Sequence, residues 1–456
     1  MTQGTLSWNR SIPVRHYVDV LVAGGGPAGI AAALAAARFG ATVFLVEQTG
    51  SLGGLGTSGL VPGFCPMSDG RDVIVGGVGR EVVDRLRAAG GTASDDEPDY
   101  WDWISFNPES LKLLYDEMLA EAGVTLRFYT AIVDVVTADS RVDAVILSGR
   151  EGPYAVQARS FVDATGDGLL SHLAGAACQT GDEAGLLQPP TLCSIFANVD
   201  WDAFEAFRQA GLPGEAVQEA VERAIGEGVF SVPDRHHSGA WRTGVHLAGM
   251  NVGHTHGVNG VDDASLTEGV IRGRRVVQEN LAFYRKYIPG FERAELATTG
   301  SLLGVRETRR VVADYMLTAD DFAAKRSFPD QIGRYNYPID LHPVEATDEA
   351  YEAFLKEFRE EFRYGVGESY GIPLRSLFVR DLANVMVAGR CMGTDRKMQG
   401  STRVMPCCFV TGQAAGVTAG MAAGHDGGVR SVESARVIEH LRETGAYIPA
   451  PVNEPH

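Results

Sequence analysis

The hydrophobic pattern is clearest near the amino end of the chain, where short apolar runs alternate with small residues. Residues 18–23, apolar except for Asp19, form a run of strand length, and residues 42–46, apolar after Thr42, form a second one. Between them, the alanine-rich stretch 28–39 has apolar residues on every side and predicts a buried helix. A strand, a helix and a second strand in this order predict an α/β unit with parallel strands.

Farther along, the pattern changes character twice. The expected elements are a β-meander at 131–137, 142–147 and 154–164, then helices at 201–210, 215–227 and from a capping box at 265–268 to 287, then strands at 241–250, 296–305 and 310–317. A buried strand before Arg390 and a helix at 406–423 with many small residues restore the first pattern. We therefore predict an α/β domain over 1–184, an inserted α+β domain over 185–370, and a return to the first domain over 371–456.

Glycines lie between the first predicted strand and its helix. Gly24, Gly26 and Gly29 fit the G-x-G-x-x-G spacing, which permits a tight turn, close approach of a pyrophosphate, and close helix–strand packing. Pro27 and Ala28 open the helix, whose first amides carry partial positive charge that suits a diphosphate. The pattern predicts a Rossmann-like dinucleotide-binding unit.

An acidic residue and a second glycine-rich loop follow the second strand. Glu47 comes 18 residues after Gly29, close to the roughly 20 expected for the carboxylate that binds ribose hydroxyls. The loop then contributes Gln48, Gly53, Gly54, Leu55 and Thr57. With this loop the chain resembles the FAD-dependent oxidoreductases of the glutathione-reductase-like class, in which a second loop continues the FAD cradle. The resemblance implies FAD as the cofactor, rather than NAD.

The same resemblance implies cofactor contacts in three more segments. The expected residues are Ile132 and Val133 in the meander, Thr165, Gly166 and Asp167 after its last strand, and Gly389, Arg390 and Arg403 near the carboxyl end. For the segment 165–167 the alternative is a turn after an edge strand. Segments 304–310, 337–342, 371–377 and 389–406 resemble the broad bacterial branch of this family, which is related to the flavin subunit of heterodisulfide reductase.

Composition narrows the class of protein. The 456 residues carry a net charge of −18, which argues against a nucleic-acid or anionic-membrane partner. None of the six cysteines forms a C-x-x-C pair, so we expect neither an iron–sulfur cluster nor a thiol–disulfide pair. Residues 1–15 hold no apolar segment, and the apolar stretch 18–37 is broken by glycines, so we expect a cytoplasmic protein without a membrane span.

Candidate catalytic residues lie mostly in the predicted insertion. Arg306 is a candidate anchor for a substrate carbonyl or carboxylate, the alternative being an ion pair with a neighbouring acid. His254 and His256 would face one side if they lay on a strand, as candidate bases or as surface residues. Tyr337 lies near Asp340 and His342 in a polar, aromatic patch. We expect no metal, because no carboxylate or cysteine stands at ligand spacing from the histidines.

These observations predict an FAD-dependent dehydrogenase or oxidase. A small organic substrate would lose a hydride to the flavin N5, with a histidine or the Tyr/Asp set as base and an arginine as anchor. Oxygen or a separate carrier would reoxidise the flavin. The sequence leaves open whether the protein forms a homo-oligomer. The alternatives are a flavoprotein hydroxylase or monooxygenase, which the missing second glycine fingerprint for NAD(P)H weakens, and a non-redox FAD-dependent modifying protein.

Overall fold

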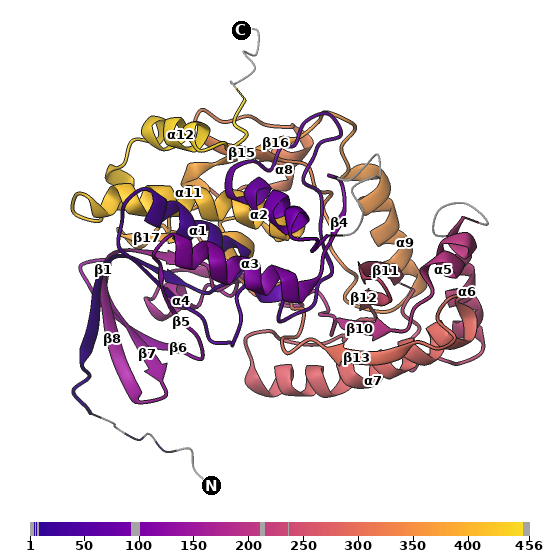
Figure 1. Ribbon diagram of the computed structural model, residues 1–456. Helices are drawn as coiled ribbons and strands as arrows, with labels where there is room; N and C mark the ends of the chain where they lie inside the picture. Colours follow the sequence, from indigo (N-terminus) through magenta and orange to yellow (C-terminus); the bar gives the residue numbers. More distant parts are fainter. Residues whose placement is uncertain are drawn as a thin grey trace.

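The computed structural model describes residues 4, 6, 9–92, 101–209, 215–235 and 237–449. Its larger lobe is built on a seven-stranded sheet (Figure 1). The strands of this sheet are β1 (Val14–Ala23), β2 (Val43–Val46), β5 (Thr125–Arg127), β6 (Ala131–Ala138), β7 (Arg141–Gly149), β8 (Gly152–Asp163) and β17 (Val385–Val387). Their order is β5-β2-β1-β8-β7-β6, with β17 also paired to β8.

Strand β8 belongs to two parts of this sheet at once. It runs parallel to β1 and to β17 near its carboxyl end, where Val162 lies opposite both Val22 and Met386. Nearer its start it pairs antiparallel with β7, which pairs with β6. The predicted parallel unit and β-meander are thus confirmed. The segment after β8 follows a central strand, so the alternative of an edge-strand turn is wrong.

The helices of the larger lobe pack against the sheet and against one another. They are α1 (Pro27–Arg38), α2 (Gly77–Ala88), α3 (Pro108–Glu121), α4 (Leu169–Leu173), α11 (Met405–Ala423) and α12 (Ser434–Glu443). Helices α1 and α11 touch through their backbones, because a Cβ on Gly412 or Gly416 would lie 2.1 Å from the carbonyl oxygen of Ala28 or Ala32. The small residues predicted along 406–423 therefore have a packing role: they let two helices approach closely in the core.

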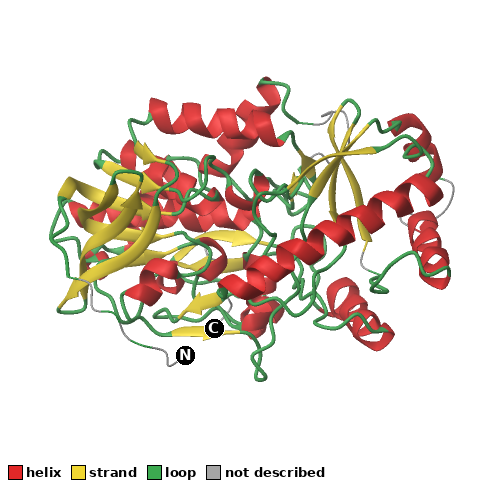
Figure 2. Cartoon of the chain, turned by 90° about the horizontal axis from the view of Figure 1, so that it is seen from below, coloured by secondary structure: helices red, strands yellow, loops and turns green. Residues whose placement is uncertain are grey.

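The smaller lobe has its own sheet and its own core. Its elements are β10 (Ser194–Ala197), β11 (His237–Gly244), β12 (Leu247–Val252), β13 (Glu295–Thr299), α5 (Trp201–Arg208), α6 (Glu215–Gly226) and α7 (Asp263–Tyr287). The strands pair antiparallel in the order β11-β12-β10-β13, and α7 lies across the lobe (Figure 2). The predicted capping box at 265–268 is wrong, because Asp262 caps α7 by accepting a hydrogen bond from the Ser265 amide.

The remaining elements connect the lobes. They are β3 (Gly63–Phe64), β4 (Ile104–Ser105), β9 (Cys178–Thr180), β14 (Arg309–Val311), β15 (Gln331–Tyr335), β16 (Tyr370–Pro373), α8 (Ala319–Ala323), α9 (Asp348–Lys356) and α10 (Arg396–Thr402). The core of the smaller lobe draws on residues 192–305, whereas buried residues between 311 and 372 pack into the core of the larger lobe. The expected strands at 296–305 and 310–317 are much shorter, since each reaches only as far as its partner strand. The division at 185 and 370 stays a prediction.

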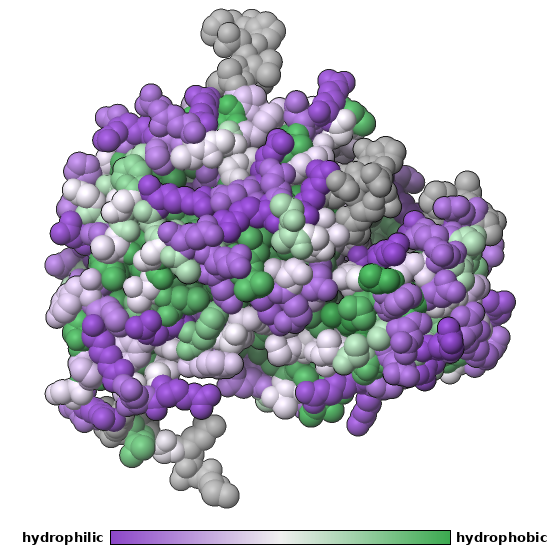
Figure 3. Space-filling view, viewed as in Figure 1, coloured by the Kyte–Doolittle hydropathy of each residue, from purple (hydrophilic) through white to green (hydrophobic). Residues whose placement is uncertain are grey.

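Hydrophobic residues occur both on the surface and along the helices of the described part of the chain. In Figure 3, hydrophilic residues are spread over the face in view, with hydrophobic residues in small patches between them. Across the described ranges, no single helix is long and apolar enough to cross a membrane, although α10 and α11 pass that test together as a pair bent by 94°. Nearly every residue of α11 is buried inside the protein.

Candidate active site

A cavity of about 250 Å³ lies where the carboxyl ends of four parallel strands meet the N-termini of α1 and α11. Residues that follow β1, β2, β8 and β17 all line it. The predicted cofactor residues on its wall are Gly24, Gly26, Pro27, Ala28, Glu47, Gln48, Gly54, Leu55, Ile132, Thr165, Gly166, Asp167, Gly389, Arg390 and Arg403. The fold thus gathers seven separate segments of the chain around one space, at the edge where ligands bind in open α/β sheets.

Four predicted cofactor residues lie outside this wall. Gly29 is behind the turn, where a Cβ would come within 1.8 Å of the Gly24 carbonyl oxygen. Gly53 has φ +101° and donates its amide hydrogen to the Gly25 carbonyl. Thr57 donates its hydroxyl to the Leu52 carbonyl, and Val133 is exposed. The first three therefore shape the two glycine loops rather than face the cavity.

The glycine turn and Glu47 form one hydrogen-bonded unit. The Glu47 carboxylate accepts hydrogen bonds from the amides of Gly25, at 2.8 Å, and Thr49, at 2.7 Å. It is buried at the cavity wall, so it holds the turn and faces the cavity at the same time. Gly26 opens onto space, since a Cβ there would meet no atom within 4 Å.

The two helices whose N-termini lie at the cavity begin without a side-chain N-cap, as α2, α4 and α12 also do. Helices α3, α5, α7, α8, α9 and α10 each have an Asn, Asp or Thr side chain that accepts a hydrogen bond from a first-turn amide. Within the described part of the chain, no such N-cap side chain serves α1 or α11. Their first-turn amides and the positive ends of their dipoles are therefore directed at the cavity. This arrangement suits an elongated ligand with negative charge at two places.

Two arginines at the carboxyl side of the cavity differ in what they hold. Arg390 donates to the Gly166 carbonyl at 2.9 Å, to the Asp167 carboxylate at 2.5 Å, and to the Val305 carbonyl. Arg403 donates through Nη2 to Asp340 at 2.8 Å, while its buried Nε has no hydrogen-bond partner among the described residues. Arg390 therefore braces the wall, and Arg403 keeps a donor available.

Sequence reasoning missed part of the wall. The additional residues are Val46, Thr130, Ala164, Leu169, Leu302, Leu303, Val305, Ala388, Met405 and Cys408. Most of them are neighbours of the recognised motifs and could have been found by extending those motifs by one or two positions. Leu302 and Leu303 come from the end of the smaller lobe and carry no sequence signal of their own, whereas Val305 lies in the segment 304–310 that resembles the family.

None of the four predicted catalytic residues lines this cavity, but Tyr337 reaches it through one intermediate residue. The Tyr337 hydroxyl donates to Asp340 Oδ2 at 3.1 Å, and the same oxygen accepts from Arg403. Burial, and then the charge of Asp340, raise the pKa of Tyr337 well above its ordinary value. His342 Nε2 lies 3.2 Å from Asp340 Oδ1. A buried carboxylate thus joins a tyrosine, a histidine and the cavity arginine.

His254 and His256 lie farther from the cavity than Tyr337, and His254 is linked to Asp340 through His342. His254 Nε2 is 2.8 Å from His342 Nδ1, and His254 Nδ1 is 2.9 Å from Asp234. His256 places Nδ1 2.8 Å from the Val344 carbonyl. Both histidines lie in the loop after β12 and not on a strand, so the expected alternation of side chains does not apply. Residue 236, the first of the other histidines in this region, lies outside the described residues.

Arg306 is buried and has no acidic partner. It donates to the Pro189 carbonyl at 2.7 Å and to the Thr191 hydroxyl at 3.0 Å. The alternative ion pair with Glu307 is wrong, because Glu307 is held by two other arginines, 310 and 396. Among the described residues, no carboxylate lies within ion-pair distance of Arg306. Burial, and then the nearby charge of Arg403, lower the pKa of Arg306 to about 10.

A parallel sheet whose strand ends, glycine turn and ribose-type acid face one cavity defines a dinucleotide-binding oxidoreductase fold. The sequence pattern of the family described as FAD dependent oxidoreductase matches residues 19–443, and the chain belongs to that family. Its cofactor is therefore FAD. The uncapped helix ends, the open space at Gly26 and the unpartnered Arg403 Nε all fit this group.

Three solved structures show how far the similarity extends. A geranylgeranyl bacteriochlorophyll reductase-like protein from Thermoplasma acidophilum is 12% identical, with a TM-score of 0.45 over 94% of this chain and 83% of that one. The myxobacterial chondrochloren halogenase CndH is 14% identical, with 0.44 over 94% and 79%. The anhydrotetracycline hydroxylase OxyS from Streptomyces rimosus is 13% identical, with 0.41 over 93% and 65%. Similarities of this size carry no information about a substrate.

Proposed function

We propose that the protein is an FAD-dependent dehydrogenase or oxidase that acts on a small organic molecule with a carboxylate or carbonyl group. The observation that carries this proposal is Arg403 in the cavity wall, with the buried Arg306 close to it outside the wall. Arg306 has no acidic partner among the described residues, and Arg403 Nε has no hydrogen-bond partner there. When bound, FAD supplies the hydride acceptor.

The two arginines are suited to anchor a substrate. A guanidinium with a pKa of about 10 remains charged near neutral pH, so Arg306 is a buried cation that forms no ion pair with any described carboxylate. Taking such a charge out of water is costly, and an anionic or strongly polar ligand oxygen offsets that cost. Guanidinium groups also bind carboxylates through two parallel hydrogen bonds, which fixes the orientation of the ligand.

Asp340 and His342 are the best placed residues to accept a proton. A tyrosine whose pKa is raised well above 10 stays protonated, so Tyr337 acts as a hydrogen-bond donor and not as a base. When a carbon–hydrogen bond of a hydroxyl-bearing carbon loses its hydride, the hydroxyl proton must leave as well. Asp340 would take it beside Arg403, and the contact with His342 would let the proton pass outward.

An anaerobic screen tests this function. Purified protein is mixed, without oxygen, with a panel of small hydroxy and amino acids, alcohols and amines, and the oxidised flavin band is followed. We expect at least one acid of the panel to bleach the band without NADPH. Bleaching only by NADPH, with product formed only when oxygen is present, would contradict the proposal and support the monooxygenase alternative.

Variants of Arg306 test whether this residue binds the substrate that the screen identifies. Arg306→Leu should raise the KM for the bleaching acid by about 10-fold or more, since a charge-assisted contact is lost, while FAD content is unchanged. The KM of Arg306→Lys should lie between those of Arg306→Leu and the unchanged protein, because lysine keeps the charge and loses the planar guanidinium group. Arg272→Leu, on the exposed side of α7, is the matched control and should leave KM unchanged. An unchanged KM in Arg306→Leu would remove Arg306 from the substrate site.

A further inference from the structure

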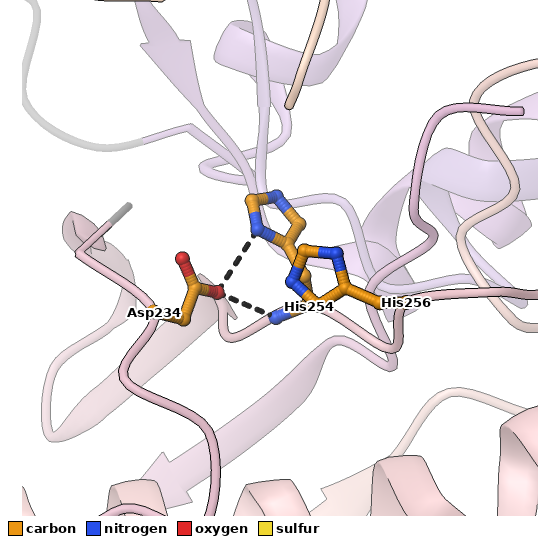
Figure 4. Close-up of side chains that lie close together, drawn as sticks. All are labelled: Asp234, His254 and His256. Atoms are coloured by element: carbon orange, nitrogen blue, oxygen red, sulfur yellow. Dashed lines mark hydrogen bonds and ion pairs between the residues drawn. The ribbon is translucent and has the colours of Figure 1, made fainter. Parts of the chain in front are cut away.

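Three potential metal ligands converge at the open end of a hairpin in the smaller lobe. Strands β11 and β12 pair antiparallel with His237 opposite Val252, so the residues just before β11 and just after β12 are neighbours. Asp234 precedes the hairpin, and His254 and His256 follow it. Figure 4 shows the carboxylate and both rings turned toward one another. One ligand atom from each residue lies within 4.8 Å of the others.

The contacts of His254 are compatible with a cation at this place. Asp234, His254, His342 and Asp340 form a row with three close contacts: Asp234 with His254, His254 with His342, and His342 with Asp340. Each neutral imidazole carries one hydrogen and one lone pair, and the tautomer of each ring decides which nitrogen donates. In the tautomer in which His254 donates from Nε2 to His342, the His254 Nδ1 lone pair faces Asp234, and a proton or a metal cation fits between them.

His256 distinguishes between these two possibilities. Its Nδ1 lies 2.8 Å from the Val344 carbonyl, which can only accept, so the ring carries its hydrogen on Nδ1 and a lone pair on Nε2. That Nε2 is buried and has no hydrogen-bond partner among the described residues. A shared proton would serve His254 and Asp234 alone, whereas a metal ion would also use the second lone pair.

We propose that Asp234, His254 and His256 bind one divalent first-row transition-metal ion. Two imidazoles and one carboxylate are a common ligand set for such ions and leave at least one coordination position open. The hydrogen bonds from His254 to His342 and from His256 to Val344 orient the two rings, as outer contacts of metal-bound histidines do. The three ligands do not line the flavin cavity, and Zn²⁺ binding can be measured whether or not the proposed reaction is correct.

The geometry needs only a small adjustment to hold an ion. Ligands at ~2.1 Å from a tetrahedral ion lie about 3.4 Å apart. The His254–Asp234 contact of 2.9 Å would open slightly, and the widest separation of at most 4.8 Å would shorten by about 1.4 Å. The rings of His254 and His256, with centroids 5.6 Å apart and planes at 72°, are already placed as two neighbouring ligands of one ion.

Zinc binding tests the proposal. The FAD-loaded protein is freed of metal with a chelator and titrated with Zn²⁺ in a calorimeter, and its metal content is measured after dialysis. Zn²⁺ is the right probe, because a nitrogen and oxygen site that takes Mn²⁺, Fe²⁺ or Co²⁺ generally binds Zn²⁺ at least comparably. We expect one equivalent of Zn²⁺ per chain with a submicromolar dissociation constant.

Matched variants decide which residues hold the ion. His256→Gln should weaken Zn²⁺ binding by at least about 100-fold, as should Asp234→Asn. His246→Gln, at an exposed histidine of the same lobe, is the control and should bind as the unchanged protein does. FAD content and circular dichroism show whether each variant is folded. No tight equivalent in the unchanged protein, or equal binding by all folded variants, would overturn the proposal.

Discussion

The flavin cavity and the row of side chains from Asp234 to Asp340 are both buried polar sites, yet they are encoded differently. The cavity is made of segments in which neighbouring residues act together, such as the turn from Gly24 to Gly29. The row takes single residues from a loop before β11, a loop after β12 and the segment at 340–342. A site of the first kind leaves a motif in the sequence, and a site of the second kind exists only in the fold.

The two sites meet at Asp340 and Arg403. Arg403 lines the cavity and donates to Asp340, which is the inner end of the row. The smaller lobe therefore reaches the cofactor side in two ways: through the contact of His254 with His342 and Asp340, and through residues 302–305. Removing parts of either site should show how far each depends on the other.

The largest effect is expected from Gly26→Val. A Cβ at residue 26 would meet no protein atom within 4 Å, and φ of −73° is open to any residue, so we expect the chain to fold normally. The valine would occupy space that the pyrophosphate needs, and FAD affinity should fall at least about 100-fold, or ~2.8 kcal/mol. Released flavin per chain measures this. Zn²⁺ binding at Asp234 should be unchanged, and its loss would show that the two sites are not separate.

The next effect is on stability and concerns the contact between α1 and α11. Gly412→Ala and Gly416→Ala each place a Cβ 2.1 Å from a backbone oxygen, so one helix must move. The free energy of unfolding should fall by about 1–3 kcal/mol. Gly420→Ala is the control, because its Cβ would lie 3.3 Å from the Phe39 ring. Urea unfolding at constant slope measures the difference, and equal midpoints for all three variants would contradict the described packing.

A smaller effect, on kcat/KM, is expected from replacing His342, which lies between His254 and Asp340 in the row. His342→Leu removes the contacts to His254 and Asp340 while keeping an apolar side chain against Phe354. With the substrate identified by the screen, kcat/KM should fall about 10-fold or more, and FAD content should stay the same. His440→Leu, next to Phe39 on the far side of α1, serves as the control. Unchanged kinetics in His342→Leu would mean that the row takes no part in turnover.

The smallest effect is expected from Tyr337→Phe. The variant loses one hydrogen bond to Asp340, worth about 1 kcal/mol, so kcat/KM should change by no more than about fivefold. Because burial raises the pKa of Tyr337 well above 10, the group does not titrate between pH 6 and 9. The pH profile in that range should therefore keep its shape. Loss of a limb of the profile would identify Tyr337 as the base after all.

Much of the fold could be predicted from the sequence, because its signals are local. The run of strand, glycine turn, helix and acid around Gly26 and Glu47 encodes one α/β unit, and polar turns delimit the meander. The strand lengths in the insertion could not be predicted. Residues 296–305 read as one strand, but only 295–299 have a partner in β10, and residues 302–305 turn toward the cavity instead.

The second site could not be predicted for a related reason. No carboxylate stands at ligand spacing from His254 in the sequence, and the expectation of no metal was based on that spacing. The hairpin of β11 and β12 brings Asp234 across from 20 residues away, to within 2.9 Å.

The central claim is that FAD occupies the cavity between the amino-terminal glycines and the segment at Arg390 and Arg403. The most direct measurement is an electron-density map of the yellow, FAD-loaded protein. We expect the adenosine ribose at Glu47, the pyrophosphate at Gly26 and the isoalloxazine ring beside the N-terminus of α11. Flavin density elsewhere, or a nicotinamide nucleotide in this cavity, would contradict the account.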